Sequence, residues 1–306
     1  MKRDFLSLND LAPAELVAVL DRADALKAER GRVDQTGLLA GRNVGMLFNK
    51  PSVRTRVSFE IGIQEMGGRV VFMQEAETQL SKREPLGHAA RVFSRYLDAL
   101  VIRTFAQADL VEMAGQASIP VINALTDDFH PCQLLADLMT VREKKGRLNN
   151  LKIAWVGDGN NMSHSWLNAA ALLGFDLALA VPAEYRPNEG VLARARERAS
   201  GTIVLTHDPA EAVEGADVVN TDVWASMGRE AESEVRSRVF GPFQVNLALL
   251  KRAAPNAVVL HCLPAHLGQE ITEEVLEGPW SAVFDQAENR LHAQKALLEF
   301  LLKKQK

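Results

Sequence analysis

The sequence predicts an α/β protein with two domains, each a mostly parallel sheet flanked by helices. Apolar runs of strand length alternate with amphipathic helical segments along the chain. These runs are apolar throughout, as is typical of parallel strands that are covered on both faces. A basic helical segment in the middle, "LMTVREKKGRLNN", separates two α/β halves that join near residues 140–150.

The first expected element is a helix that Pro13 opens and Gly31 closes. Later helical segments include "SVRTRVSFEIGIQEMGG", "HPCQLLADLMTVREKKG" and "MSHSWLNAAALLG", and the last, "AENRLHAQKALLEFLLKK", is a long helix with no strand after it. Nine strands are expected near residues 43–48, 70–73, 99–103, 120–124, 151–157, 176–181, 202–206, 217–221 and 257–261.

The composition is that of a globular protein and excludes several function classes. The 306 residues are 47% hydrophobic and 24% charged, with a net charge of −4, so there is no global basic surface for nucleic acid. Two cysteines, Cys132 and Cys262, are too few for a disulfide framework and indicate a reducing compartment. No apolar run is long enough to span a bilayer, and "MKRDFLSLNDL" lacks the apolar core of a signal peptide. We therefore expect a cytoplasmic protein.

Unusual polar clusters follow the expected strands, at the edge of a parallel sheet where ligands bind. Four of the clusters directly precede an expected helix. In chain order they are "KPSVRTR", Arg103 within "IRTF", "FHPCQ", "GDGNNMSHS", "DVWASMG" and "HCLP".

The cluster "SVRTR" is suited to an anion. A helix that starts near Ser52 directs free backbone N–H groups and its dipole toward a ligand. Thr55 adds a hydroxyl, and Arg54 adds a guanidinium that matches phosphate oxygens. The alternative is an ordinary N-cap with solvated arginines. Arg103 favours the anion site, because it ends an apolar run where a cation needs a partner.

The cluster "HPCQ" places His130 and Gln133 one helical turn apart. His130 could polarise a carbonyl oxygen, and Gln133 could orient an amide or an amine. The alternative is a plain helix start with Pro131 at the first position.

The cluster "GDGNN" follows a strand and opens a helix, but it lacks the third glycine of a dinucleotide-binding fingerprint. Asn161 is therefore interpreted as a donor to a small polar ligand, or as a helix cap. In "DVWASMG", the Asp222 carboxylate suits an amino group, and an exposed loop is the alternative.

In "HCLP", Cys262 is either a buried structural residue or part of a site. A metal site is the other interpretation of His261, Cys262 and His266, but no second Cys/His pair at zinc spacing supports it. We expect no metal.

Six motifs in the same order resemble those of ornithine carbamoyltransferases. They cover essentially the whole chain: "KPSVRTRVSFE", "HPCQLLADL", "GDGNN", "DVWASMG", "HCLPAH" and "AENRLHAQKALL". The resemblance implies transfer of the carbamoyl group from carbamoyl phosphate to the δ-amino group of L-ornithine. The products would be L-citrulline and phosphate, which places the reaction in arginine metabolism.

The resemblance also implies the domain organisation and the assembly. Residues 1–145 would bind carbamoyl phosphate, residues 146–285 would bind ornithine, and a C-terminal helix, 286–306, would pack back on the first domain. The protein would form a homotrimer with active sites at subunit boundaries. It would use no cofactor or metal. The composition and the apolar runs separately predict that it binds neither nucleic acid nor membrane.

For carbamoyl phosphate, the resemblance implies a phosphate cradle, a group that polarises the carbamoyl oxygen, and a group that holds the carbamoyl end. The cradle would be Ser52, Val53, Arg54, Thr55 and Arg103. Thr55, Arg103 and His130 would polarise the oxygen. Gln133, Arg290 and the carbonyls of Cys262 and Leu263 would hold the carbamoyl end, and Gln79 would reach a neighbouring subunit's site. The groups expected to act in catalysis are Arg54, Arg103, His130, Cys262 and Arg290.

For ornithine, the resemblance implies that Asn161 takes the carboxylate and that Asp222 and Ser226 take the α-amino group. Met227 would close over it. Cys262 would lie near the δ-nitrogen, which must lose its proton to act as a nucleophile.

The sequence departs from the family pattern at several positions. Val53 stands where threonine is usual, so one hydroxyl is missing. Lys82 and Arg83 make "TQLSKREP" more basic than expected, and Leu267 stands where arginine is frequent. None of these positions removes a core catalytic group.

Three rival interpretations stay open at this point. A transcarbamylase could use another amine, such as putrescine or an N-acylated ornithine. A non-catalytic subunit could keep the fold alone, although the retained arginines and His130 argue against it. A dehydrogenase is disfavoured by the missing glycine.

Overall fold

The computed structural model describes all residues except 1, 75–79, 81–83, 226–231 and 304–306. The chain divides into two compact units. Unit 1 comprises Met1–Met139 and Asn289–Lys306, and unit 2 comprises Thr140–Glu288. Each unit holds one sheet.

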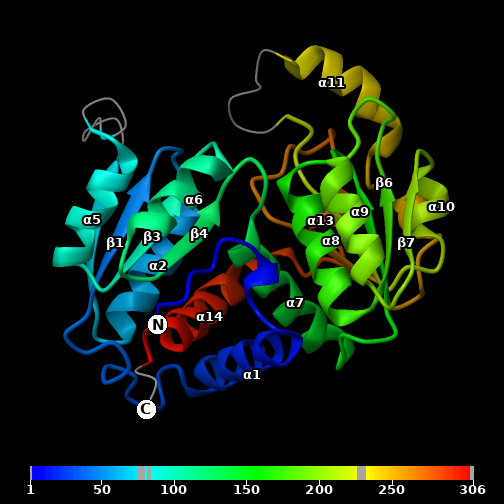
Figure 1. The fold of residues 1–306 in the computed structure, drawn as a ribbon. Coiled ribbons are helices and arrows are strands. Elements are labelled where there is room, and N and C mark those ends of the chain that lie inside the picture. The colour runs from blue at the N-terminus through cyan, green and yellow to red at the C-terminus, as the bar shows by residue number, and fades with distance from the viewer. Residues whose placement is uncertain (1, 75–79, 81–83, 226–231, 304–306) are drawn as a thin grey trace. The chain divides into compact units, whose positions relative to one another are not determined.

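Unit 1 contains a four-stranded parallel sheet with the strand order β2-β1-β3-β4 (Figure 1). The central strands are buried along almost their whole length, because helices cover both faces. Phe48 pairs with Arg103 at the carboxyl ends of β1 and β3, so the segments that follow these two strands start side by side. The strands are β1 (Asn43–Phe48), β2 (Arg69–Gln74), β3 (Ala99–Arg103) and β4 (Val121–Leu125).

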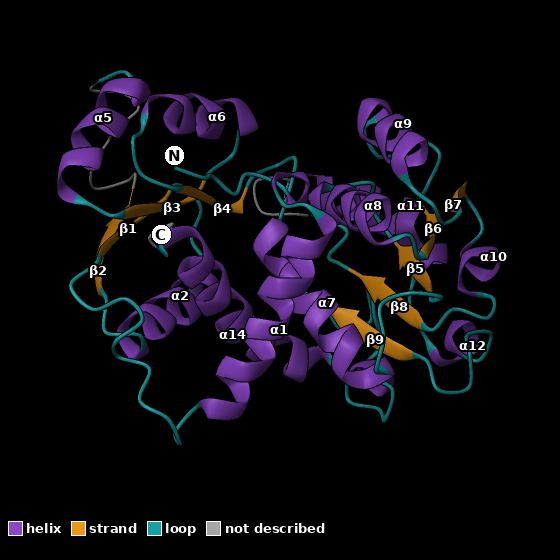
Figure 2. Ribbon diagram, turned by 60° about the horizontal axis from the view of Figure 1, so that its bottom comes forward, coloured by secondary structure: helices purple, strands orange, loops and turns teal. Residues whose placement is uncertain are grey.

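The helices of unit 1 lie on both faces of its sheet. Figure 2 shows α5 and α6 on one face and α2, α1 and α14 on the other. A short 3-10 turn, η1 (Leu8–Asp10), precedes them. The helices are α1 (Pro13–Glu29), α2 (Val53–Glu65), α5 (Leu86–Tyr96) and α6 (Gln107–Gln116). Two further helices belong to unit 1 in part: α7 (Pro131–Lys145) up to Met139, and α14 (Val283–Leu302) from Asn289 onward.

The C-terminal helix α14 packs on unit 1, as expected. The buried Lys295 ammonium lies 2.7 Å from the Glu65 carboxylate. Arg22 donates from Nε to Glu299 at 2.7 Å. Because a buried ammonium needs a carboxylate partner, these pairs fix the register of α14 against α1 and α2.

Unit 2 contains a five-stranded parallel sheet with the order β7-β6-β5-β8-β9. Helices α8 and α9 lie on one face, and α10 and α12 lie on the other (Figure 2). The strands are β5 (Lys152–Val156), β6 (Asp176–Ala180), β7 (Ile203–Thr206), β8 (Val218–Thr221) and β9 (Val258–His261). The helices are α8 (Asn161–Leu173), α9 (Glu189–Arg198), α10 (Pro209–Val213), α11 (Ser233–Phe240), η3 (Gly241–Phe243), α12 (Leu247–Leu250) and α13 (Glu273–Leu276).

The predicted fold class is confirmed: two parallel sheets are flanked by helices, and all nine expected strands form. One expected helix was predicted to be longer than it is. The basic helix does not continue through residue 150 but ends at Lys145, because Gly146 adopts a left-handed conformation (φ 71°) that stops it. Within the described residues, no helix combines the length and the apolar character needed to cross a bilayer.

Candidate active site

Ser52 begins α2 at the end of the loop that follows β1. Its hydroxyl accepts a hydrogen bond from the Thr55 backbone N–H at 3.3 Å and donates to Thr55 Oγ1 at 3.0 Å. Ser52 is therefore a true N-cap, and the start of α2 can still favour an anion. The Val53 side chain is 78% exposed, so its backbone N–H is the group that it can offer.

Two arginines belong to this edge of the sheet. Arg103 ends β3 and is 6% exposed, and its carbonyl accepts a hydrogen bond from Asn49 N–H at 2.8 Å. That bond holds the loop before α2 against the end of β3. Arg54, one residue into the helix, has no hydrogen-bond or ion-pair partner among the described residues. Its charge is therefore available to a ligand.

A third arginine, Arg290 on α14, connects two helices of unit 1. Its Nη2 donates to Thr55 Oγ1 at 2.7 Å, and its Nη1 donates to Gln133 Oε1 at 3.0 Å. The Gln133 amide nitrogen in turn donates to Asp137 Oδ1 at 2.8 Å. All of these side chains are buried. This chain fixes the orientation of the Gln133 amide, which sequence reasoning left open.

His130 lies immediately before Pro131, the first residue of α7, and is 4% exposed. Burial, followed by the positive charges of Arg290 and Arg103, lowers the pKa of His130 well below 6.5. The imidazole is therefore neutral at physiological pH and can donate an N–H to a carbonyl oxygen without carrying a charge. We call Ser52, Arg54, Thr55, Arg103, His130, Gln133 and Arg290 the unit 1 cluster.

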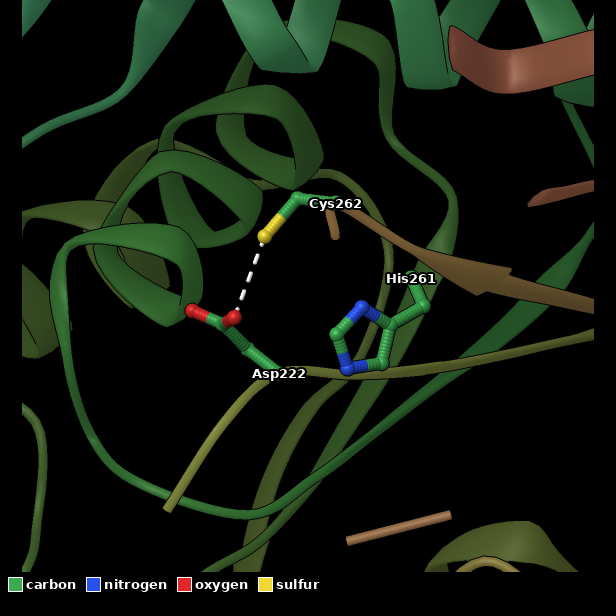
Figure 3. Close-up of side chains that lie close together, drawn as sticks. All are labelled: Asp222, His261 and Cys262. Carbon is green, nitrogen blue, oxygen red and sulfur yellow. Dashed lines mark hydrogen bonds between the residues drawn. The ribbon is translucent and has the colours of Figure 1, made fainter. Parts of the chain in front are cut away.

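Asp222 is the centre of a second cluster, in unit 2. It follows β8 and is 8% exposed. Its Oδ1 accepts hydrogen bonds from Val223 N–H at 2.8 Å and from Cys262 Sγ at 3.0 Å. Its Oδ2 accepts from Asn160 Nδ2 at 3.1 Å. Figure 3 shows the bond between the thiol and the carboxylate, with His261 beside it.

Asn160 is the N-cap of α8, a role that sequence reasoning offered to Asn161. The Asn160 Oδ1 accepts from Met162 N–H at 2.9 Å and from Ser163 N–H at 3.3 Å. Asn161 is the first residue of the helix and is half-buried. Its expected contact with a ligand carboxylate stays a prediction. We call Asn160, Asn161, Asp222 and Cys262 the unit 2 cluster.

Cys262 is partly exposed and donates its S–H to a carboxylate. A thiolate at that distance would repel Asp222, so this partner favours the thiol. Reactive thiolates are instead stabilised by neighbouring cations. The geometry thus gives Cys262 a role as a hydrogen-bond donor at the Asp222 carboxylate.

His261 holds the segment around Cys262. Its Nδ1 accepts from Leu263 N–H at 2.8 Å, so its Nε2 carries the proton and donates to Glu270 Oε1 at 3.1 Å. Both side chains are 0% exposed. Leu263 adopts a positive φ of 58°, an uncommon conformation that this bond supports. Sequence reasoning missed Glu270, because a spacing of nine residues across a loop carries no recognised signal.

The metal alternative gains no support from this geometry. The potential ligand atoms of Asp222, His261 and Cys262 lie within 4.8 Å of one another. However, both nitrogens of His261 already form hydrogen bonds, and the thiol donates to Asp222. An ion would have to break these bonds.

Several expected site residues lie outside the described residues: Gln79, Ser226 and Met227, together with Lys82 and Arg83 of the basic loop. Leu263, whose carbonyl was expected to bind the carbamoyl end, is half-buried. Leu267 is 50% exposed.

Two family models match consecutive parts of the chain. Residues 3–143 match the carbamoyl-P binding domain of aspartate/ornithine carbamoyltransferase, and residues 149–301 match its Asp/Orn binding domain. The second match includes most of α14, although the part of this helix from Asn289 onward belongs to unit 1.

Curated relatives and solved structures agree with these matches. The chain is 54% identical to an ornithine carbamoyltransferase of Pelobacter propionicus, with 99% of each chain covered. It is 53% identical to one of Desulfotalea psychrophila, over 97% of this chain and 98% of the relative. An ornithine carbamoyltransferase structure from Pyrococcus furiosus has a TM-score of 0.96 at 46% identity, covering 100% of this chain and 98% of that one. The chain therefore belongs to the aspartate/ornithine carbamoyltransferase family.

Proposed function

We propose that the protein transfers the carbamoyl group of carbamoyl phosphate to the δ-amino group of L-ornithine, giving L-citrulline and phosphate. The observation that carries this proposal is the unit 1 cluster, in which three arginines and a neutral histidine gather at one sheet edge. Such a set matches a phosphate with a carbonyl attached to it, because fixed donors can then stabilise charge on both groups.

The chemistry assigns a task to each part of the unit 1 cluster. The δ-nitrogen lone pair attacks the carbamoyl carbon, the bond from that carbon to the phosphate oxygen breaks, and phosphate leaves with the electron pair. The start of α2 with Ser52, Arg54 and Thr55 binds the phosphate. Arg103 and His130 donate to the carbamoyl oxygen, which gains negative charge during the attack. The nitrogen releases one proton, which the departing phosphate takes up.

Arg290 and Gln133 hold the carbamoyl end in this proposal. Arg290 already donates to Thr55 and Gln133, so it reaches the phosphate side and the amide side of the cluster together. One amide N–H of Gln133 donates to Asp137, and the second N–H can donate to the substrate. Because these residues are ordered before the substrate binds, little reorganisation is needed during the reaction.

The unit 2 cluster takes the amino acid in this proposal. Asp222 receives the α-ammonium, with Ser226, and Asn161 donates to the carboxylate. Met227 closes over the α-amino group, whereas the carbonyls of Cys262 and Leu263 are assigned to the carbamoyl end. The support for this part is the buried, hydrogen-bonded Asp222 carboxylate, which suits a cation.

The dehydrogenase alternative is disfavoured by the packing of the "GDGNN" loop. A Cβ on Gly159 would meet the backbone nitrogen of Pro187 at 2.3 Å. This glycine is therefore required by the neighbouring chain segment and needs no cofactor to explain it. Asp158, next to it, is paired with Arg236.

We further propose that the protein is a cytoplasmic homotrimer in which Gln79 reaches a neighbouring subunit's site. The exposed side chains Val53, Val57 and Ile61 follow one another at helical spacing on α2, and such an apolar stripe favours a protein contact. The two cysteines are free thiols, in keeping with a reducing compartment.

Mixing variants tests the shared site. A Gln79→Ala chain and a His130→Ala chain, each inactive alone, should regain activity in mixed oligomers, because some sites then carry neither defect. Verified mixed oligomers without activity would argue against shared sites.

The activity is tested by incubating the protein with carbamoyl phosphate and a panel of amines. The panel holds L-ornithine, putrescine, N-acetyl-L-ornithine and L-aspartate, and both released phosphate and the carbamoylated product are measured. We expect citrulline as the dominant product. A different preferred amine would keep the carbamoyl transfer and overturn the acceptor, and no carbamoylated product would overturn the transfer itself.

A further inference from the structure

Arg236 is a buried arginine that the proposed chemistry does not use. It lies on α11 and is 0% exposed. Its guanidinium carbon lies 4.5 Å from the ring centroid of Tyr185 and 5.6 Å from that of Phe240. A buried cation is costly unless it is paired, so its partners indicate what it is for.

The partners of Arg236 come from three separate segments of unit 2. Its Nη1 donates to Asp158 Oδ2 at 2.8 Å and to the carbonyl of Trp224 at 2.6 Å. Its Nε donates to Glu232 Oε2 at 2.9 Å. The fork of a guanidinium makes these bonds in a fixed geometry. Arg236 therefore connects the loop after β5, the loop after β8 and the start of α11.

The first two of these loops carry the proposed ornithine-binding residues. Asp158 lies three residues before Asn161, and Trp224 lies two residues after Asp222. A second link between the same loops is the hydrogen bond from Asn160 Nδ2 to Asp222 Oδ2 at 3.1 Å. The Trp224 ring also stacks on Phe240, with the centroids 6.1 Å apart. The relative position of the two loops thus depends on Arg236 and the rings around it.

We propose that Arg236 is a positioning residue for the amino-acid substrate. It holds the two loops at the separation at which Asn161 can take the carboxylate while Asp222 takes the α-ammonium. This inference rests on the proposed function. It predicts a defect confined to the acceptor, because the side chains assigned to carbamoyl phosphate belong to unit 1 and Arg236 contacts none of those that the structure describes.

The test uses Arg236→Lys, which keeps a cation for Asp158 but cannot make all three bonds. We expect kcat/KM for ornithine to fall by about 10- to 100-fold, mostly through KM, as for other displaced positioning groups. The thermal midpoint should fall, because Arg236 is buried and lysine cannot make all of its bonds, but KM for carbamoyl phosphate should stay near the wild-type value. The matched control is Arg238→Lys, an exposed arginine on the same helix, which should change none of these quantities.

A binding measurement separates positioning from catalysis. L-norvaline is ornithine without its δ-amino group, so it offers the same α-groups and cannot react. With carbamoyl phosphate saturating, calorimetry should show its Kd rising in Arg236→Lys by the same factor as KM for ornithine. An unchanged Kd and KM would overturn the proposal. An equal rise in KM for ornithine and for carbamoyl phosphate would also overturn the proposal, because Arg236 would then be a general structural residue.

A second variant protects the test against misfolding. Glu232 is half-exposed, with 52% of its side chain accessible, so Glu232→Ala removes one hydrogen-bond acceptor of Arg236 while Asp158 still pairs with the buried charge. It should raise KM for ornithine in the same direction by a smaller factor, and no rise would overturn the proposal. Failure of the proposed function is a separate result, since the wild-type protein would then form no citrulline.

Discussion

The two clusters use the same backbone arrangement with opposite charge. Each lies at the carboxyl end of a parallel sheet, where a polar residue caps the helix that follows a buried strand. In unit 1 the cap, Ser52, is joined by Arg54, Arg103 and Arg290. In unit 2 the cap, Asn160, donates to the carboxylate of Asp222.

The two clusters differ in side-chain charge and not in backbone arrangement, and we propose that this charge selects the ligand. Ser52 accepts one backbone N–H, whereas Asn160 accepts two, so the start of α8 has fewer donors left for an anion. The Asp222 carboxylate then makes that edge suitable for a cation. In the proposed division of roles, an acyl phosphate binds at the first cluster and an ammonium group binds at the second.

The largest expected effect concerns the choice of acceptor in unit 2. A site that pairs with a free α-ammonium and carboxylate rejects an amine that lacks them, because its own buried groups stay unpaired. We expect ornithine to be preferred over putrescine by a factor of about 10⁴ in kcat/KM. Asp222→Asn should erode that preference while carbamoyl phosphate binding stays nearly intact. A wild-type protein that used both amines equally well would contradict this division of roles.

The next effect concerns the charge of the unit 1 cluster. Arg54→Ala should lower turnover by about 10²- to 10³-fold, the usual cost of removing one preorganised donor. Folding should be little affected, since Arg54 has no ion-pair partner among the described residues. The control is Arg56→Ala, whose guanidinium pairs with Glu60 on the helix surface at 3.3 Å. Near-normal turnover in Arg54→Ala would remove the phosphate-binding role.

The neutral state of His130 predicts how the free energy of unfolding depends on pH. Its pKa is lowered well below 6.5 in the folded protein, so the unfolded chain binds a proton as pH falls through about 6.5 while the folded protein does not. Stability is therefore lost on acidification, by up to about 1.4 kcal/mol per pH unit from this residue. Urea unfolding of His130→Gln, at fixed chain concentration, should show a shallower loss below that pH. Parallel curves for the two proteins would contradict a buried neutral imidazole.

The smallest effect compares one cysteine from each unit. Burial raises the pKa of Cys132 to about 12, and its thiol donates to the Asn123 carbonyl at 3.2 Å. Cys262 is partly exposed. Iodoacetamide should therefore modify Cys262 in the native protein, slowly because its thiol donates to Asp222, and leave Cys132 intact, as read by mass spectrometry of the peptides. The Cys262→Ser variant should resist modification until it is unfolded, and early labelling of Cys132 would contradict its burial.

The strands and the edge of each sheet could be predicted from the sequence because their signals are local. Apolar runs fix the strands, and Pro131 and Ser52 mark helix starts. The end of the basic helix was missed because charged residues continued the pattern beyond Gly146, where backbone conformation decided the outcome.

The connections within each cluster could not be predicted, because they join residues far apart in the chain. The bonds of Arg290 to Thr55 and Gln133 span most of the sequence, and only the resemblance suggested that Arg290 belongs there. Nothing local to Glu270 or Arg236 indicates that each holds a loop of the unit 2 cluster. The helix cap is Asn160, one residue before the predicted Asn161, because two consecutive asparagines are equally suited to the cap position.

The division of the reaction between the two clusters is tested most directly by titrating two variants with two ligands. Arg54→Ala and Asp222→Asn are each titrated calorimetrically with carbamoyl phosphate, and with L-norvaline when carbamoyl phosphate is saturating. We predict that Arg54→Ala weakens carbamoyl phosphate binding and that Asp222→Asn weakens norvaline binding, with little effect on the other ligand. If Asp222→Asn instead weakened carbamoyl phosphate binding as much as Arg54→Ala does, the two clusters would not divide the substrates between them.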